Sequence, residues 1–146
     1  MSFVLKVKPV KQLVNYCGPA CVRMILSMFG ISEDQKTLGE KCNITKDGVA
    51  PSAIIRCLKQ YKIKSYYRRN VGEKYTIDDY LNKYQSPIII GTESHYMIIV
   101  GYTDKLYIIV DPEIGKQISM PKTVVHALIK DMLIITGRKK HVIKHS

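Results

Sequence analysis

The chain has 146 residues and a formal net charge of +11 at pH 7, with 23 Lys and Arg against 12 Asp and Glu. This length predicts one domain, residues 1–146, that buries its core without a metal ion or a disulfide. The four cysteines lack CxxC and zinc-ligand spacing, the apolar runs are too short to span a membrane, and residues 1–6 are not typical of a secretory signal. We therefore expect reduced thiols, no cofactor or metal, and a cytoplasmic protein or a domain delivered within a larger effector.

The first half of the chain is predicted to be mainly helical. Residues 3–14 mix Val and Leu with Lys around Pro9, which indicates an extended arm or an edge strand. Apolar residues then recur at three- and four-residue spacing, and the Ser-x-x-Gln sequence that starts at Ser32 has the form of a capping box. The helices expected from these patterns cover residues 17–29, 32–42 and 51–61, and the first of them should end at Gly30.

The second half is predicted to form a sheet. Alternation of side chains begins at Ile63, and a short helix is expected over residues 76–84. Short β-branched runs bounded by Gly, Asp or Pro predict strands over residues 87–90, 95–102, 106–110 and 132–135, with a further short helix over 121–129. The connection at 103–105 has hairpin length, so its two strands should be antiparallel neighbours. The expected fold class is α+β, with N-terminal helices packed on a mostly antiparallel sheet.

Cys17 lies at the expected start of the first helix. Pro19 suits the first turn, because its missing N–H would have no partner there, and Gly18 leaves the backbone beside the sulfur uncovered. The partial positive charge of a helix N-terminus favours a thiolate and can stabilise an oxyanion. Cys17 is therefore a candidate nucleophile, although a lone cysteine in a reduced compartment is more often a small buried apolar residue.

His95 and Asp111 stand at the ends of the two strands joined by the 103–105 connection. If these strands pair about residue 104, His95 falls opposite position 112, next to Asp111. A carboxylate can hold one nitrogen of an imidazole while the other nitrogen faces a thiol, as a nucleophilic site requires. The alternative is a hydrogen-bonded strand histidine and a strand-ending turn without a chemical role.

Five motifs together resemble the C39 peptidases, which are papain-like cysteine peptidase domains found at the N-terminus of bacteriocin-exporting ABC transporters and as stand-alone relatives. In chain order, the motifs are Gln12 ahead of Cys17–Cys21, Asp47-Gly48 before a helix, Ser86–Ile89, His95–Tyr102 and Val110–Gly115. The resemblance covers roughly residues 10–136. It implies a papain-like fold and a peptide substrate. In the transporter-linked members of the family, cleavage follows a Gly-Gly type leader.

The resemblance also implies roles for four side chains. Cys17 would be the nucleophile, His95 the general base and then the acid, and Asp111 the residue that orients His95. Gln12 would be a side-chain donor to the oxyanion hole, beside the backbone N–H of Cys17. The family's glutamine usually stands six residues before the cysteine, where this chain has Lys11, whereas Gln12 is five residues before it. Which of the two occupies the donor position stays open.

The basic charge keeps two other functions open. It is densest at residues 62–69 and in a tail from about residue 138, and it suits RNA, an anionic surface or an acidic partner, although a solvated lysine-rich surface explains it equally well. One alternative is a papain-like toxin or effector that uses Cys17, His95 and Asp111 on another substrate, such as tRNA, and is restrained by an immunity or inhibitor protein. The other is an inactive peptide-binding module, which the presence of both Cys17 and His95 disfavours.

Overall fold

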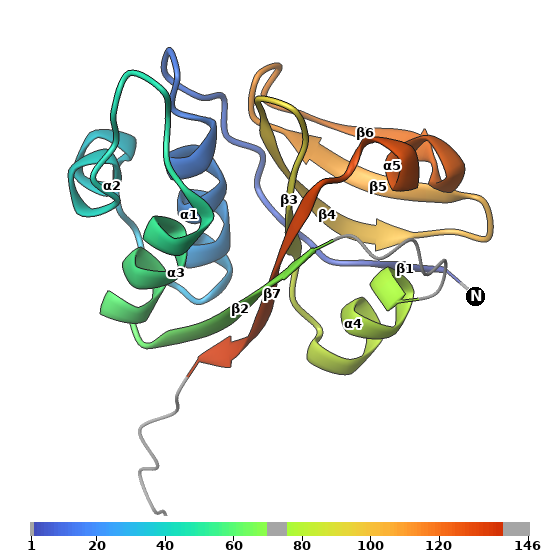
Figure 1. The fold of residues 1–146 in the computed structure, drawn as a ribbon. Coiled ribbons are helices and arrows are strands. Elements are labelled where there is room, and N and C mark those ends of the chain that lie inside the picture. Colours follow the sequence, from blue (N-terminus) through green and yellow to red (C-terminus); the bar gives the residue numbers. More distant parts are fainter. Residues whose placement is uncertain (1, 70–75, 139–146) are drawn as a thin grey trace, which may run out of the picture.

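The computed structural model describes residues 2–69 and 76–138, and it has the mixed helical and antiparallel-sheet architecture that the sequence predicts. Figure 1 shows the helices of the first half of the chain gathered on one side of the sheet. These helices are α1 (Cys17–Met28), α2 (Gln35–Lys41) and α3 (Pro51–Gln60). Within the described residues, no helix is both long enough and apolar enough to cross a membrane. The basic tail, residues 139–146, lies outside the described residues.

The strands form a sheet in which neighbours pair antiparallel. The order is β2-β7-β3-β4-β5-β6, and β1 pairs with β4 beside this path. The strands are β1 (Phe3–Val4), β2 (Ile63–Arg69), β3 (Ile88–Gly91), β4 (Tyr96–Tyr102), β5 (Leu106–Asp111), β6 (Lys116–Pro121) and β7 (Asp131–Arg138). Two more helices, α4 (Thr76–Tyr84) and α5 (Lys122–Leu128), lie on the side of the sheet away from α1–α3 (Figure 1).

Both faces of the sheet are covered, which explains the uninterrupted apolar runs in its central strands. Ile88, Ile89 and Ile90 are all buried. Neighbouring residues of a strand point to opposite faces, so Ile98 belongs to the core beneath α1–α3, while Ile99 belongs to the core beneath α4 and α5. A strand buried on both faces has no need of the polar alternation that marks a half-exposed strand.

The structure moves the start of one predicted helix, adds a strand that the sequence does not predict, and shows how far strand structure extends in the N-terminal arm. α2 begins at Gln35, later than the expected capping box at Ser32, because Asp34 caps the helix by accepting a hydrogen bond from the N–H of Thr37 at 2.8 Å. The sequence pattern does not predict β6, because its side chains are mostly exposed and its pairing with β5 defines it. The N-terminal arm, expected as an extended segment or edge strand, is a strand only at Phe3–Val4.

The rest of that arm leads the chain to the start of α1. Gly101 lets β1 lie close to β4, because a Cβ at that position would collide with the carbonyl oxygen of Phe3. The N–H of Leu5 then donates to the carbonyl oxygen of Val100 at 2.8 Å, and the side chain of Val7 is buried in the core. These contacts hold the arm against β4 and the core, so that residues 11–16 reach the point where α1 begins.

Candidate active site

Cys17 is the first residue of α1, and it is partly exposed whereas the other three cysteines are buried. A Cβ at Gly18 would lie 3.3 Å from the Cβ of Val49, so the glycine lets the loop before α3 pack against the start of α1. The N-cap residue Tyr16 makes no side-chain hydrogen bond to the helix. The side chain of Tyr16 therefore leaves the first N–H groups of α1 uncapped, and the N–H of Gly18 helps to lower the pKa of Cys17.

The β4–β5 hairpin places His95 beside Asp111. Nε2 of His95 is 2.6 Å from Oδ1 of Asp111, and the two side chains are 19% and 16% exposed. Because Ile98 pairs with Val110, position 95 by extension faces position 113, one residue further than the predicted register. Oδ1 of Asp111 also accepts a hydrogen bond from the N–H of Glu113 at 2.9 Å, which holds the carboxylate in place.

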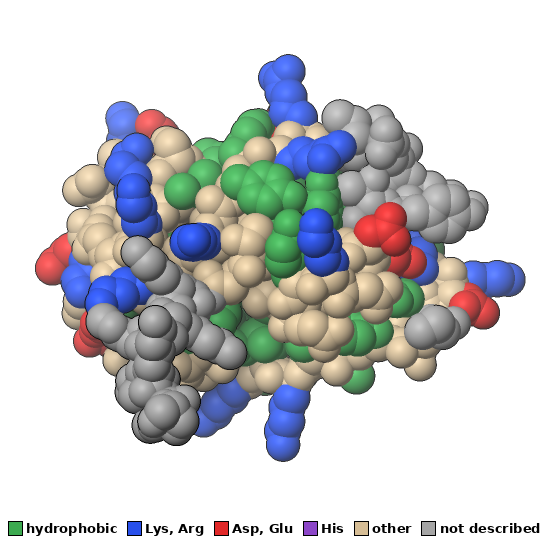
Figure 2. All heavy atoms as spheres, turned by 90° about the horizontal axis from the view of Figure 1, so that it is seen from below, with side chains coloured by type: hydrophobic (Ala, Val, Ile, Leu, Met, Phe, Trp, Pro, Cys, Tyr) green, Lys and Arg blue, Asp and Glu red, His purple; other side chains and the backbone are tan. Residues whose placement is uncertain are grey.

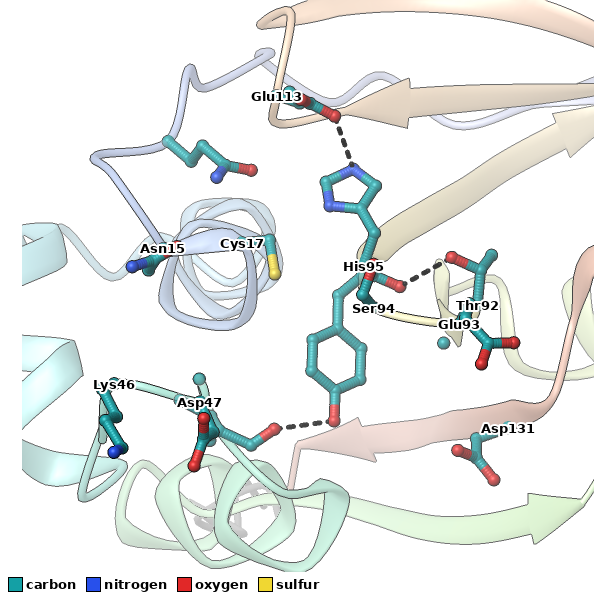
Figure 3. A pocket seen from close by; sticks show the side chains of 15 residues that line it. Asn15, Cys17, Lys46, Asp47, Thr92, Glu93, Ser94, His95, Glu113 and Asp131 are labelled. Carbon is teal, nitrogen blue, oxygen red and sulfur yellow. Dashed lines mark hydrogen bonds and ion pairs between the residues drawn. The ribbon is translucent and has the colours of Figure 1, made fainter.

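The electrostatics of the site favour a thiolate on Cys17 and an imidazolium on His95. The pKa of His95 is raised from 6.5 to about 9, chiefly by its hydrogen bond with Cys17 and, against the effect of burial, by Asp111. Burial would raise the pKa of Cys17, but hydrogen bonds from His95 and from the backbone N–H of Tyr96 lower it below its ordinary value. Figure 3 shows Cys17 on the side of α1 that faces His95, with Glu113 beyond the far side of the ring.

Gln12 lines the same cleft as Cys17 and His95, whereas Lys11 lines a separate hollow. The N–H of Gln12 donates to the carbonyl oxygen of Pro112 at 2.7 Å, which ties the arm to the residue after Asp111. Of the two residues that the sequence leaves open, Gln12 is therefore the one whose side chain shares the cleft with the sulfur.

The cleft has a volume of about 600 Å³. One of its walls is the loop before α3, which is joined to β4 because the hydroxyl of Tyr96 donates to the carbonyl oxygen of Val49 at 2.8 Å. The charged side chains that line the cleft and surround Cys17 and His95 in Figure 3 are Lys46 and four carboxylates, Asp47, Glu93, Glu113 and Asp131. In a chain with a net charge of +11, the cleft is therefore acidic.

His95, Asp111 and Glu113 come nearest to a metal-binding group among the described residues, with ligand atoms within 4.8 Å of one another. Two ligands of one zinc ion, each at roughly 2.1 Å from the metal, lie about 3.4 Å apart in a tetrahedral site. Nε2 and Oδ1 are 2.6 Å apart, which is too close for two ligands of one ion. The His95–Asp111 pair is thus arranged as a hydrogen bond and fits no metal ion as it stands.

The sequence patterns do not identify Tyr96 and Asp131 as parts of the site. The position of Tyr96 directly after His95 is a local signal that could have drawn attention to it. Asp131 has no such signal, because it reaches the cleft through the pairing of β7 with β3, in which it lies opposite Gly91. Its carboxylate accepts a hydrogen bond from the hydroxyl of Tyr67 on β2.

Known proteins are similar to this chain in sequence pattern and in fold. The sequence model described as the peptidase C39 family matches residues 6–140. No curated protein matches the chain significantly in sequence. A crystal structure of a double glycine motif protease from an AMS/PCAT transporter, in complex with the leader peptide, has a TM-score of 0.80 at 20% identity, and the alignment covers 94% of this chain and 95% of that one.

Two further crystal structures share the fold. The peptidase domain of Streptococcus ComA, a bi-functional ABC transporter involved in a quorum sensing pathway, has a TM-score of 0.79 at 21% identity, with 90% of this chain and 98% of that chain covered. A C39-like peptidase from Bacillus anthracis has a TM-score of 0.74 at 14% identity, with 96% and 100% covered. Each relative is covered almost completely, so the likeness extends over a whole peptidase domain.

Proposed function

Because the chain belongs to the peptidase C39 family, we propose that it is a cysteine peptidase with Cys17 as its nucleophile. The observation that supports this most strongly is a succession of three groups: the thiol at the start of α1 and the imidazole of His95 line one cleft, and the carboxylate of Asp111 lies 2.6 Å from Nε2 of that imidazole. The lowered pKa of Cys17 and the raised pKa of His95 supply a thiolate and a proton donor, as acyl transfer requires.

In the proposed reaction, the thiolate of Cys17 attacks the carbonyl carbon of the scissile peptide bond. The oxyanion that forms accepts hydrogen bonds from the backbone N–H of Cys17 and from the amide of Gln12. His95 donates its proton to the leaving amine, and a thioester to Cys17 remains. Water then gives a proton to His95 and attacks the thioester, which releases the second product as the acid and restores the thiolate of Cys17 beside the protonated His95. Asp111 holds Nε2 of His95, so that the other ring nitrogen serves the sulfur.

We propose that the substrate is a peptide with a Gly-Gly type cleavage site and basic residues near it. The structural neighbour from the AMS/PCAT transporter is a double glycine motif protease crystallised with its leader peptide. In this chain, Glu93 already pairs with Lys130 at 2.9 Å, and the remaining carboxylates around the cleft, Asp47, Glu113 and Asp131, would attract Lys or Arg side chains. Among the described residues, no Lys or Arg pairs with Asp131, so its charge is available to a substrate.

The same carboxylates argue against an RNA substrate in this cleft. Recognition of RNA requires Lys and Arg near the phosphates, and Lys46 is the one Lys or Arg among the described residues that line the cleft. Figure 2 shows Lys and Arg side chains spaced singly over the lower face of the molecule, around an apolar centre, rather than gathered in one groove. On this face, the positive charge is distributed as on a solvated surface rather than as in a nuclease groove.

The test compares peptide and RNA cleavage by the same preparations. Two peptides that carry Gly-Gly, followed by Lys-Lys in one and Ala-Ala in the other, are incubated with wild-type protein, Cys17→Ala and His95→Ala, and the products are identified by mass spectrometry. We expect cleavage after the second Gly by the wild-type protein alone, and faster cleavage of the basic peptide. Mixed tRNA is tested in parallel. Cleavage of tRNA that depends on Cys17, without cleavage of either peptide, would overturn the proposed function.

A further inference from the structure

Gln35 makes two hydrogen bonds to the backbone on either side of Gln12. It is the first residue of α2 and is 6% exposed. Its Oε1 accepts a hydrogen bond from the N–H of Leu13 at 2.9 Å, and its Nε2 donates to the carbonyl oxygen of Lys11 at 2.8 Å. A buried amide that uses both its acceptor and its donor on one short segment fixes the position and the orientation of that segment.

The turn after β5 holds the opposite side of the same segment. The N–H of Gln12 donates to the carbonyl oxygen of Pro112 at 2.7 Å. Gln35 therefore holds the backbone at Lys11 and Leu13, while Pro112 holds it at the residue between them. At Gly115, where φ is +68°, a Cβ would lie only 2.8 Å from the Cβ of Lys11, so the turn packs directly on the arm.

The side chain of Gln12 has no comparable support. Its Oε1 is buried and has no hydrogen-bond partner among the described residues, so its place in the cleft is set through the backbone. A compact turn then leads to Cys17: the N–H of Tyr16 donates to the carbonyl oxygen of Leu13 at 2.9 Å, and Asn15 has a left-handed φ of 62°. Asn tolerates this conformation better than most residues. The turn explains how a glutamine five residues before the cysteine can share its cleft.

We propose that Gln35 is a positioning residue, which brackets Lys11–Leu13 so that the amide of Gln12 meets the oxyanion. This inference rests on the proposed peptidase function. Removal of one oxyanion donor lowers kcat by roughly 100- to 1,000-fold in other enzymes. The oxyanion exists only after the nucleophile has attacked, so a displaced donor lowers kcat and leaves KM nearly unchanged.

Gln35→Met is the first test, because it keeps the length of the side chain and removes both hydrogen bonds. We expect kcat to fall by about 10- to 100-fold while KM changes by less than about threefold. Alkylation of Cys17 by iodoacetamide should keep its wild-type rate, because no oxyanion forms in that reaction. Gln60→Met replaces an exposed glutamine of α3 and is the matched control, for which we expect wild-type kcat. An unchanged kcat in Gln35→Met would overturn the proposal.

A double variant separates positioning from general damage. In the Gln12→Ala background, Gln35→Met should lower kcat by no more than about twofold, because the donor that Gln35 positions is already absent. A second loss as large as that in the single variant would mean that Gln35 acts through some other part of the structure, and it would overturn the proposal.

Hydrogen exchange at the amide of Leu13 tests, independently of activity, whether the two hydrogen bonds of Gln35 hold the segment Lys11–Leu13; we call this pair of hydrogen bonds the bracket. This amide should be protected in the wild-type protein and should exchange at least about tenfold faster in Gln35→Met. If the wild-type protein cleaves no peptide, the proposed function fails, while fast exchange in the variant still supports the bracket. Equal exchange in the two proteins would overturn the bracket. If Gln35→Met does not fold, Gln35→Glu is measured in the same way, since it keeps the acceptor for Leu13 and loses the donor to Lys11.

Discussion

Replacing Asp111 by Asn should weaken the coupling between His95 and Cys17 while keeping the shape of the side chain. Oδ1 of Asp111 lies 2.6 Å from Nε2 of His95, and the pKa of His95 is raised from 6.5 to about 9, first by Cys17 and then by Asp111. A hydrogen bond to a charged group contributes about 1.5–3 kcal/mol, against about 1 kcal/mol for a neutral pair. The imidazolium should therefore lose roughly 1 kcal/mol of stabilisation, which corresponds to about one pKa unit.

The sign of each change follows from the charges. Asp111 and the Cys17 thiolate both favour the imidazolium, so losing the carboxylate lowers the pKa of His95. A less protonated His95 stabilises the thiolate less, so the pKa of Cys17 rises. The active ion pair exists between these two values. The alkaline limb of kcat/KM should therefore move about one unit toward neutral pH, and the acid limb should move up by a smaller amount.

The assay is kcat/KM for a Gly-Gly peptide across roughly pH 5 to 10. Glu113→Gln is the matched control, because its carboxylate is 70% exposed and 4.0 Å from Nε2 of His95. Solvent screens such a charge, so we expect its limbs to move by less than about 0.3 unit. A profile of Asp111→Asn that superimposes on the wild-type profile, or equal shifts in the two variants, would refute the reasoning.

Three further predictions concern reactivity, specificity and stability. Iodoacetamide at neutral pH should label Cys17 well ahead of the three buried cysteines, and His95→Ala should slow this labelling. Peptide mapping that finds equal labelling rates for the four cysteines would contradict an activated thiol. Asp131→Asn should lower kcat/KM for the Lys-Lys peptide about two- to fivefold relative to the Ala-Ala peptide, and a high-salt buffer should remove the difference. Tyr107→Phe should lower the free energy of unfolding by about 1 kcal/mol, because the buried hydroxyl donates to Asp78 at 2.7 Å; urea denaturation that shows no change would exclude this contribution.

The sequence by itself determined the elements whose signals are local. Helical spacing and Pro19 defined the start of α1 at Cys17, and Gly30, with a left-handed φ of 76°, followed its end as predicted. The β-branched runs defined β3, β4 and β5, and the short connection at 103–105 predicted the β4–β5 hairpin. Each of these features depends on residues close together in the chain, so propensity and turn length were sufficient to predict them.

The tertiary structure alone decided the features that join distant segments. The cleft contains Gln12 rather than Lys11 because hydrogen bonds to Gln35 and Pro112 hold the backbone of this segment. Neither of these partners has a local pattern in the sequence. β6 needed the hydrogen bonds of β5 to become a strand, because its own side chains bury little surface. The acidic lining is likewise assembled from loops that the sheet order brings together, including Asp131 through the pairing of β7 with β3. A side chain's distance from residues far along the chain depends on packing and strand register, and those are properties of the whole fold.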